Sequence, residues 1–164
     1  MSQAFRILGI TVVLALSAGC VLAQDRTAEF RSRFVHESDP IHKAMLLVPL
    51  GNAEFLEIQK GFEEGDLPEA LAVLQMYRDE ARTCKDGLEA KGIDAERHPS
   101  GFKQLQISLR EALRRLDDLV ITIPRDEQAP FLDVRKDIDE MNRRLIGELF
   151  PRQPNAAEPA KKKE

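Results

Sequence analysis

Apolar residues recur three and four positions apart along most of the chain, which is the spacing of one face of an α-helix. The alternation of apolar and polar residues that is typical of a half-buried strand is missing. The sequence therefore predicts an all-α protein.

Three long amphipathic helices are expected, over about 67–91, 99–123 and 126–149. Because turns of only a few residues join them, we predict that neighbouring helices run antiparallel and pack at shallow angles through coiled-coil-like seams. The three apolar seams are Leu67, Ala70, Leu74, Tyr77, Ala81, Cys84 and Leu88; Phe102, Leu105, Leu109, Ala112, Leu116, Leu119 and Ile123; and Phe131, Val134, Ile138, Met141, Leu145 and Leu149.

Two or three shorter helices are expected before the long ones, over about 27–37, 40–47 and 52–64. They are expected to cover an open side of the bundle formed by the three long helices.

Local signals set the ends of these short helices. Asp39 and Pro40 are typical of a cap and a first helical turn. Pro49 and Gly51 are expected to stop the second short helix, after which Asn52 would cap the third.

The turn that follows resembles part of a tetratricopeptide repeat. Gly65-Asp66-Leu67 and then Glu69-Ala70-Leu71 match the turn and second helix of that repeat, in which a small residue such as Ala70 lets the two helices approach closely. The resemblance covers residues 52 to about 77, and the chain contains one such copy, whereas the family needs about three stacked copies for stability. It implies a helical hairpin at this turn, and not membership of the repeat family.

The first 23 residues have the layout of an export signal. A single charge, Arg6, precedes an apolar run from Ile7 to Leu16, which is too short for a membrane span of roughly 20 apolar residues. Because Val21 and Ala23 occupy the two positions that signal peptidase reads, we expect cleavage after Ala23. The mature protein would then be periplasmic or secreted.

A lipid anchor on Cys20 is the alternative. Residues 16–20, Leu-Ser-Ala-Gly-Cys, resemble the lipobox of bacterial lipoproteins, in which the cysteine is diacylated and becomes the mature amino terminus. The family places a large aliphatic residue three positions before the cysteine, where this chain has Ser17. Modification of Cys20 would make the protein a membrane-anchored lipoprotein.

Residues 24–150 are long enough for one helical domain with a sizeable core, and residues 151–164, rich in Pro, Ala, Lys and Glu, are predicted to be a disordered tail. The formal net charge of −4 disfavours nonspecific binding to nucleic acid or to anionic lipid, because both need a clustered excess of Lys and Arg.

Three histidines, His36, His42 and His98, are the first candidates for metal binding or general-base catalysis. Asp39 and His42 lie three positions apart, but Pro40 separates them at a helix start, and a di-metal bundle needs such pairs on two helices. The chain contains neither His-Glu-x-x-His nor Cys-x-x-Cys-His. We therefore assign no metal ligand and no cofactor, and expect exposed imidazoles at helix ends.

Cys84 lies on an apolar seam between Ala81 and Leu88, so it is expected to be buried with a raised pKa rather than to act as a nucleophile. Once the first 23 residues are removed it has no intramolecular disulfide partner, and an intermolecular disulfide is the alternative.

Acidic and basic side chains four positions apart could be mistaken for catalytic carboxylates or a basic patch. At this spacing we expect surface ion pairs, each worth a few tenths of a kcal/mol. The pairs are Glu111 with Arg115, Arg114 with Asp118, Asp139 with Arg143, and Glu140 with Arg144.

No cluster in the sequence has the spacing of known catalytic chemistry, so no catalytic residue is assigned. The leading hypothesis is a noncatalytic module of the bacterial envelope or exterior that binds another protein. The alternative is a bundle that binds a small ligand or metal under its short helices, and an enzyme comes third. The sequence leaves open whether Ile107, Leu113, Leu132 and Ile146 serve the core or an interface.

Export can be tested by the mass of the mature protein. We expect a chain that begins at Gln24, because the signal peptidase pattern ends at Ala23. Intact-mass spectrometry of the protein recovered from its native cells measures this. A chain that begins at a diacylated Cys20 would contradict the prediction.

Overall fold

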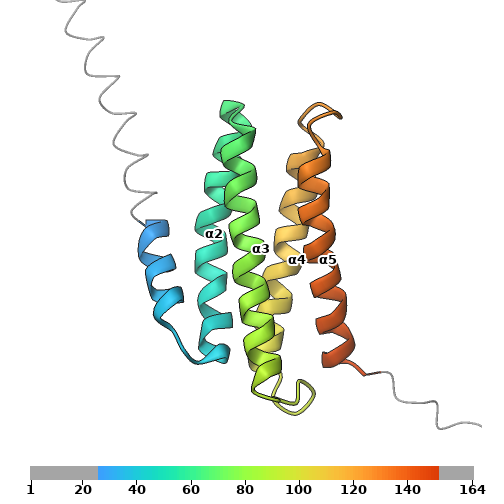
Figure 1. Ribbon diagram of the computed structural model, residues 1–164. Helices are drawn as coiled ribbons and strands as arrows, with labels where there is room; N and C mark the ends of the chain where they lie inside the picture. Colours follow the sequence, from blue (N-terminus) through green and yellow to red (C-terminus); the bar gives the residue numbers. More distant parts are fainter. Residues whose placement is uncertain (1–25, 152–164) are drawn as a thin grey trace, which may run out of the picture.

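The computed structural model describes residues 26–151, and every regular element in that range is an α-helix (Figure 1). This confirms the predicted all-α class. A helix over residues 26–36 comes first. It is followed by α2 (Pro40–Glu64), α3 (Leu67–Ala90), α4 (Ser100–Val120) and α5 (Ala129–Leu149).

Three predictions fall outside the described residues: the export signal over 1–23, the lipid anchor on Cys20, and the tail from residue 152 onward. Among the residues that are described, none of the helices combines the length and apolar character needed to cross a membrane.

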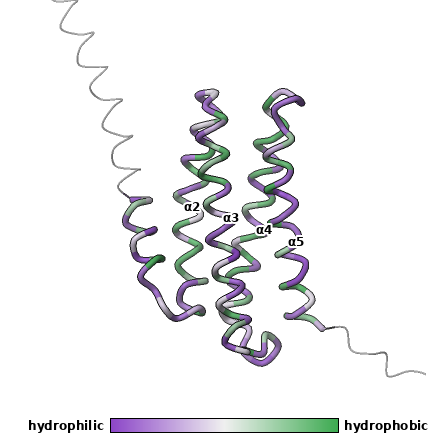
Figure 2. Tube along the Cα trace, in the orientation of Figure 1, coloured by the Kyte–Doolittle hydropathy of each residue, from purple (hydrophilic) through white to green (hydrophobic). Residues whose placement is uncertain are grey.

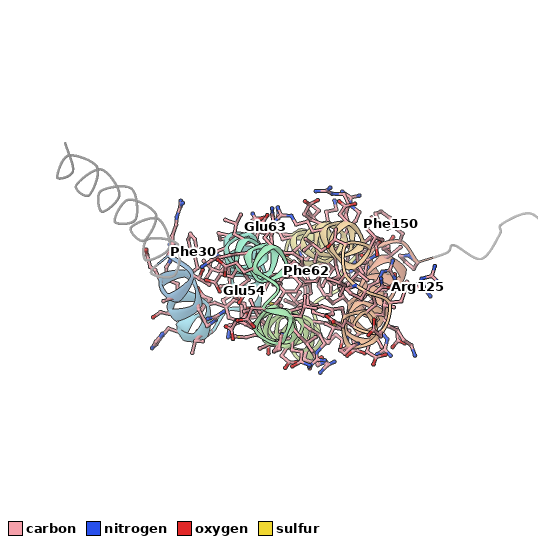
Figure 3. The ribbon with its side chains drawn as sticks, turned by 90° about the horizontal axis from the view of Figure 1, so that it is seen from above. Phe30, Glu54, Phe62, Glu63, Arg125 and Phe150 are labelled. Atoms are coloured by element: carbon pink, nitrogen blue, oxygen red, sulfur yellow. The ribbon has the colours of Figure 1, made fainter. Side chains whose placement is uncertain are left out.

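The four long helices form two antiparallel hairpins packed side by side. α2 pairs with α3 and α4 pairs with α5, and the hairpins meet with α2 against α4 and α3 against α5. Consecutive helices therefore run antiparallel, as predicted, whereas α2 with α4 and α3 with α5 run parallel. Seen from above, α2 and α4 line one face, α3 and α5 line the other, and helix 26–36 lies outside the first hairpin (Figure 3).

The prediction of three long helices covered by shorter ones is wrong for residues 40–64. These residues form one helix of 25 residues, with Pro49 in its interior. Within residues 26–151 the bundle therefore has four long helices, and helix 26–36 is the one short cover.

Tertiary packing explains why Pro49 and Gly51 do not break α2. One stripe of the helix stays buried on both sides of these residues, and its members are Ala44, Leu47, Leu50, Gly51, Glu54, Phe55, Ile58 and Gly61. A Cβ at Gly51 would lie 2.7 Å from Cε2 of Tyr77, so the glycine makes room for that ring. Asn52, the predicted cap, is an interior residue of α2.

Other predicted helix ends are confirmed. Asp39 caps α2 by accepting a hydrogen bond from the backbone N–H of His42 at 3.0 Å. Gly65 ends α2 with a left-handed φ of 75°, and the Asp66 side chain caps α3. The hairpin implied by this turn is present, and its helices approach closely, since a Cβ on Gly61 would lie 2.9 Å from that of Ala70.

The predicted seams form the core. All their members are buried or half-buried, and apolar and polar positions alternate along each helix (Figure 2). Of the four apolar residues left unassigned, Leu113 is buried, whereas Ile107, Leu132 and Ile146 are exposed. The structure places α4 and α5 within the predicted ranges, but α5 begins at Ala129 rather than near 126.

Replacing Pro49 with Ala should stabilise the protein. Alanine restores the N–H that bonds the carbonyl of residue 45 in a continuous helix, and the expected gain in the free energy of unfolding is about 2 kcal/mol. Urea denaturation measures it. Pro68→Ala is the matched control, because Pro68 lies in the first turn of α3, where its missing N–H costs nothing. An unchanged stability of Pro49→Ala would argue against a regular α2 at this point.

Candidate functional site

A small pocket opens between α2 and α4, and Tyr77 of α3 contributes to it from the core. Its volume is about 100 Å³. The lining residues are Val48, Gly51, Asn52, Phe55, Tyr77, Ile107, Ser108, Glu111, Ala112 and Arg115.

Tyr77 is fixed at this pocket by three contacts. The edge of its ring packs on Phe55, with ring centroids 5.4 Å apart. Its hydroxyl lies 3.0 Å from Oγ of Ser108, and its ring fills the space left by Gly51. Because burial raises the pKa of the Tyr77 hydroxyl well above its ordinary value, this group stays neutral and can serve as a hydrogen-bonding partner only.

A second, shallower depression continues the same surface toward the carboxyl ends of α2 and α4. It shares Phe55 and Arg115 with the first pocket and adds Leu56, Gln59, Arg114, Asp118 and Leu119. We call the two depressions together the α2–α4 face. Its most exposed apolar side chains are Leu56 at 63% and Ile107 at 45%.

Arg115 is held across the middle of the α2–α4 face. Its guanidinium donates to Oδ1 of Asn52 at 2.9 Å and to Oε1 of Glu111 at 3.0 Å, and it lies over the Phe55 ring. Hydrogen bonds from Arg114 and Arg115 lower the pKa of the Glu111 carboxyl to about 2. Glu111 is therefore ionised at neutral pH and is unsuited to act as a proton donor or acceptor.

A separate cluster of charge is buried beneath helix 26–36. Arg31 of that helix donates to Oε1 of Glu54 on α2 at 2.6 Å, and its Nε lies 3.4 Å from Oε1 of Glu80 on α3. The Glu54 side chain is 0% exposed and that of Glu80 is 12% exposed. Three atoms of the cluster, Oε2 of each carboxyl and Nε of Arg31, are buried without a hydrogen-bond partner.

The two carboxyls of this cluster lie close enough to share a hydrogen bond, which one proton would complete. Burial and the neighbouring Glu80 carboxylate raise the pKa of Glu54 to about 8, against the opposing effect of Arg31. Burial also raises the pKa of Glu80. Of the two carboxyls, that of Glu54 therefore keeps its proton at neutral pH, beside the guanidinium of Arg31.

The three histidines are exposed, as predicted, and do not converge. His36 and His42 border one shallow depression, and His98 borders another. Asp39 and His42 do come together, with Nδ1 of the imidazole 3.7 Å from Oδ2 of the carboxylate, but Asp39 also caps α2 and accepts from Lys91. Within residues 26–151 no group of three or more His, Cys, Asp or Glu side chains could hold a metal ion.

Cys84 is fully buried on its seam, as predicted, and burial raises its pKa to about 12. The thiol therefore belongs to the core and is a poor nucleophile.

Three of the four predicted surface ion pairs are formed, namely Glu111–Arg115, Arg114–Asp118 and Asp139–Arg143. Glu140 and Arg144 form no ion pair with each other in the described part of the chain. Arg114 also pairs with Glu111, so these arginines do not form an unpaired basic patch.

Sequence reasoning missed Arg31, Glu54 and Glu80. Each occupies a position three or four residues from buried neighbours on its own helix, as Glu54 does between Leu50 and Ile58. A charged residue in register with an apolar stripe is the signal that could have identified them.

Comparisons of the chain with protein-family models, with curated proteins and with solved structures found no match. Its function must therefore be inferred from its own residues and their geometry.

The thiol of Cys84 should react slowly in the native protein. Raising its pKa from 9 to about 12 lowers the thiolate fraction about a thousandfold at pH 8, and burial slows the reaction further. Labelling with a chromogenic disulfide reagent, native and in urea, measures the ratio. The control is Cys84→Ala with Ser100→Cys, which carries an exposed thiol. Native labelling of Cys84 as fast as this control would contradict burial.

Proposed function

We propose that this chain is an exported, noncatalytic helical module that binds another protein through the α2–α4 face. The observation that carries the proposal is a pair of exposed apolar side chains on two parallel helices, Ile107 at the pocket and Leu56 at the shallower depression that continues from it. Apolar side chains gathered around a groove with a polar rim are typical of protein interaction sites, and a helix of a partner fits such a groove.

The packing of the bundle supports the choice of this face. Helix 26–36 covers the outer side of the α2–α3 hairpin, where Arg31 contacts both helices. No segment of the described chain lies over the α2–α4 face in the same way. Polar contacts, Gln106 with Asn142 and Arg135 with Asp117, connect α4 to α5 on their other side.

The chemistry of the α2–α4 face favours binding over catalysis. Besides the guanidinium of Arg115, the titratable groups that line the pocket are Tyr77, which stays neutral, and Glu111, which stays ionised and paired with two arginines. General acid–base catalysis needs a group whose pKa lies near the operating pH. Glu54 has such a pKa, but it lies beneath helix 26–36 and does not line the pocket.

The alternative of a small-ligand site is less well supported by the size of the pocket. The pocket, of about 100 Å³, is well below the roughly 300 Å³ at which pockets for drug-sized ligands begin, and the adjoining depression of about 450 Å³ is shallow and open rather than enclosed. A protein partner needs no enclosed cavity, because it buries a wide surface around a few anchoring side chains.

Export to the periplasm or the exterior is part of the proposal and rests on the signal-like residues 1–23. A lipid anchor on Cys20 would place the same module at a membrane surface.

A photo-crosslinking amino acid at position 107 should capture one defined partner in native cells, and the same group at position 146 should not. Ile107 and Ile146 are the same residue type with similar exposures, 45% and 41%, on α4 and α5 respectively. Leu56→Glu should abolish the crosslink from position 107, because a partner that binds the groove would then have to bury an unpaired carboxylate. The adducts are identified by mass spectrometry.

Equal capture at positions 107 and 146, or capture at 107 that Leu56→Glu leaves unchanged, would exclude the α2–α4 face as the binding surface. Circular dichroism of Leu56→Glu checks that the helices remain folded.

A further inference from the structure

Helix 26–36 is a peripheral element with a small buried surface. Thr27 and Phe34 are its buried side chains, and Phe30 is partly buried against the core. Residues 37–39 alone connect the helix to α2, so it can move as a unit while the two hairpins stay packed. Figure 3 shows Phe30 and Glu54 at the boundary between this helix and the α2–α3 hairpin.

Charge in the groove under this helix is not balanced by the protein alone. Two carboxyls, Glu54 and Glu80, face one guanidinium, that of Arg31. The two oxygens left without a partner, Oε2 of Glu54 and Oε2 of Glu80, belong to the two carboxyls that approach each other. A buried acceptor without a donor costs about 1–3 kcal/mol, and one proton between these carboxyls satisfies both oxygens.

We propose that a single proton shared by Glu54 and Glu80 latches helix 26–36 onto the α2–α3 hairpin, and that loss of this proton releases the helix. In the latched state the protonated Glu54 accepts a hydrogen bond from Arg31 through Oε1 and donates one to Glu80 through Oε2. Oε2 of both carboxyls then has a hydrogen-bond partner, Nε of Arg31 keeps its ion pair with Glu80 at 3.4 Å, and the net charge of the cluster is zero.

Ionisation of Glu54 in the latched state adds a second anion where helix 26–36 excludes water. The added attraction to Arg31 does not compensate, because burial and the Glu80 carboxylate affect Glu54 more strongly than Arg31 does. Release of the helix lets water reach both carboxylates and removes most of this cost.

The other charged or titratable groups around the cluster do not donate a proton to Glu54 or Glu80. Cys84 and Tyr77 have raised pKa values and stay neutral, and Lys43 lies over the Phe34 ring at 5.2 Å. Asp79, beside Glu80 on α3, pairs with Arg78 and Arg82. Six side chains from helix 26–36, α2, α3 and α4 affect the pKa values of Glu54, Glu80 and their buried neighbours. They are Arg31, Lys43, Tyr77, Asp79, Cys84 and Arg115.

The sign of the pH dependence follows from the direction of the pKa change. Glu54 binds its proton more tightly when the helix is latched, with a pKa of about 8 against an ordinary value of 4.5. Between these values the latched state holds one proton more than the open state, so latching weakens about tenfold for each unit of pH. It is strongest below pH 4.5 and levels off above about pH 8.

Hydrogen–deuterium exchange of the purified protein, from pH 5 to pH 9.5 and corrected for the intrinsic effect of pH, tests the latch. We expect the opening constant of amides in helix 26–36 to rise about tenfold per pH unit up to about pH 8 and then level off. Amides of α4 should show no such change. In Glu54→Gln the amide donates to Glu80 and accepts from Arg31 at every pH, so the opening constant should stay flat.

Glu63→Gln is the matched control, because Glu63 is an exposed glutamate on the same helix and should keep the wild-type profile. A flat wild-type profile, a wild-type slope in Glu54→Gln, or a parallel rise in α4 would each overturn the latch. If Glu54→Gln does not fold, Glu80→Gln makes the same test, because its amide can donate to Glu54.

Discussion

The Tyr77 ring, inserted against the backbone of α2 at Gly51, is the contact on which the arrangement of the helices depends. Tyr77 has the largest fully buried side chain among the described residues, and it joins α3 to Phe55 of α2 and to Ser108 of α4. A Cβ at Gly51 would occupy the same space as the ring. A glycine inside a helix costs about 1 kcal/mol relative to alanine, and here that cost allows three helices to meet at one side chain.

One side of the α2–α3 hairpin is covered, and another side is exposed. On the outer side helix 26–36 covers the hairpin, and its docking depends on a buried cluster of three ionisable groups. On the α2–α4 face apolar side chains stay exposed beside a pocket that Tyr77 and Arg115 hold in shape. α2 contributes to both sides: its Glu54 is buried under helix 26–36, and its Leu56 is exposed on the α2–α4 face.

α3, α4 and α5 could be predicted from the sequence because their seams repeat without interruption. Every predicted seam residue is at least half-buried. α2 could not, because Pro49 and Gly51 are local stop signals whereas the contact that overrides them, with Tyr77, lies across the fold. The cluster of Arg31, Glu54 and Glu80 was missed for the same reason, since the three charges come from separate helices and meet only after packing. Exposed histidines and surface ion pairs were predictable because they depend on spacing within one helix.

The parallel course of α2 and α4 gives their shared face a direction. Both helices begin at the same end of the bundle, near Pro40 and Ser100, and both end at the other, near Glu64 and Val120 (Figure 1). Each helix carries about half a positive charge at its amino end and half a negative charge at its carboxyl end, and in a parallel pair these dipoles add. A third helix laid along the groove is therefore electrostatically favoured in one orientation, with its own amino end beside Glu64 and Val120.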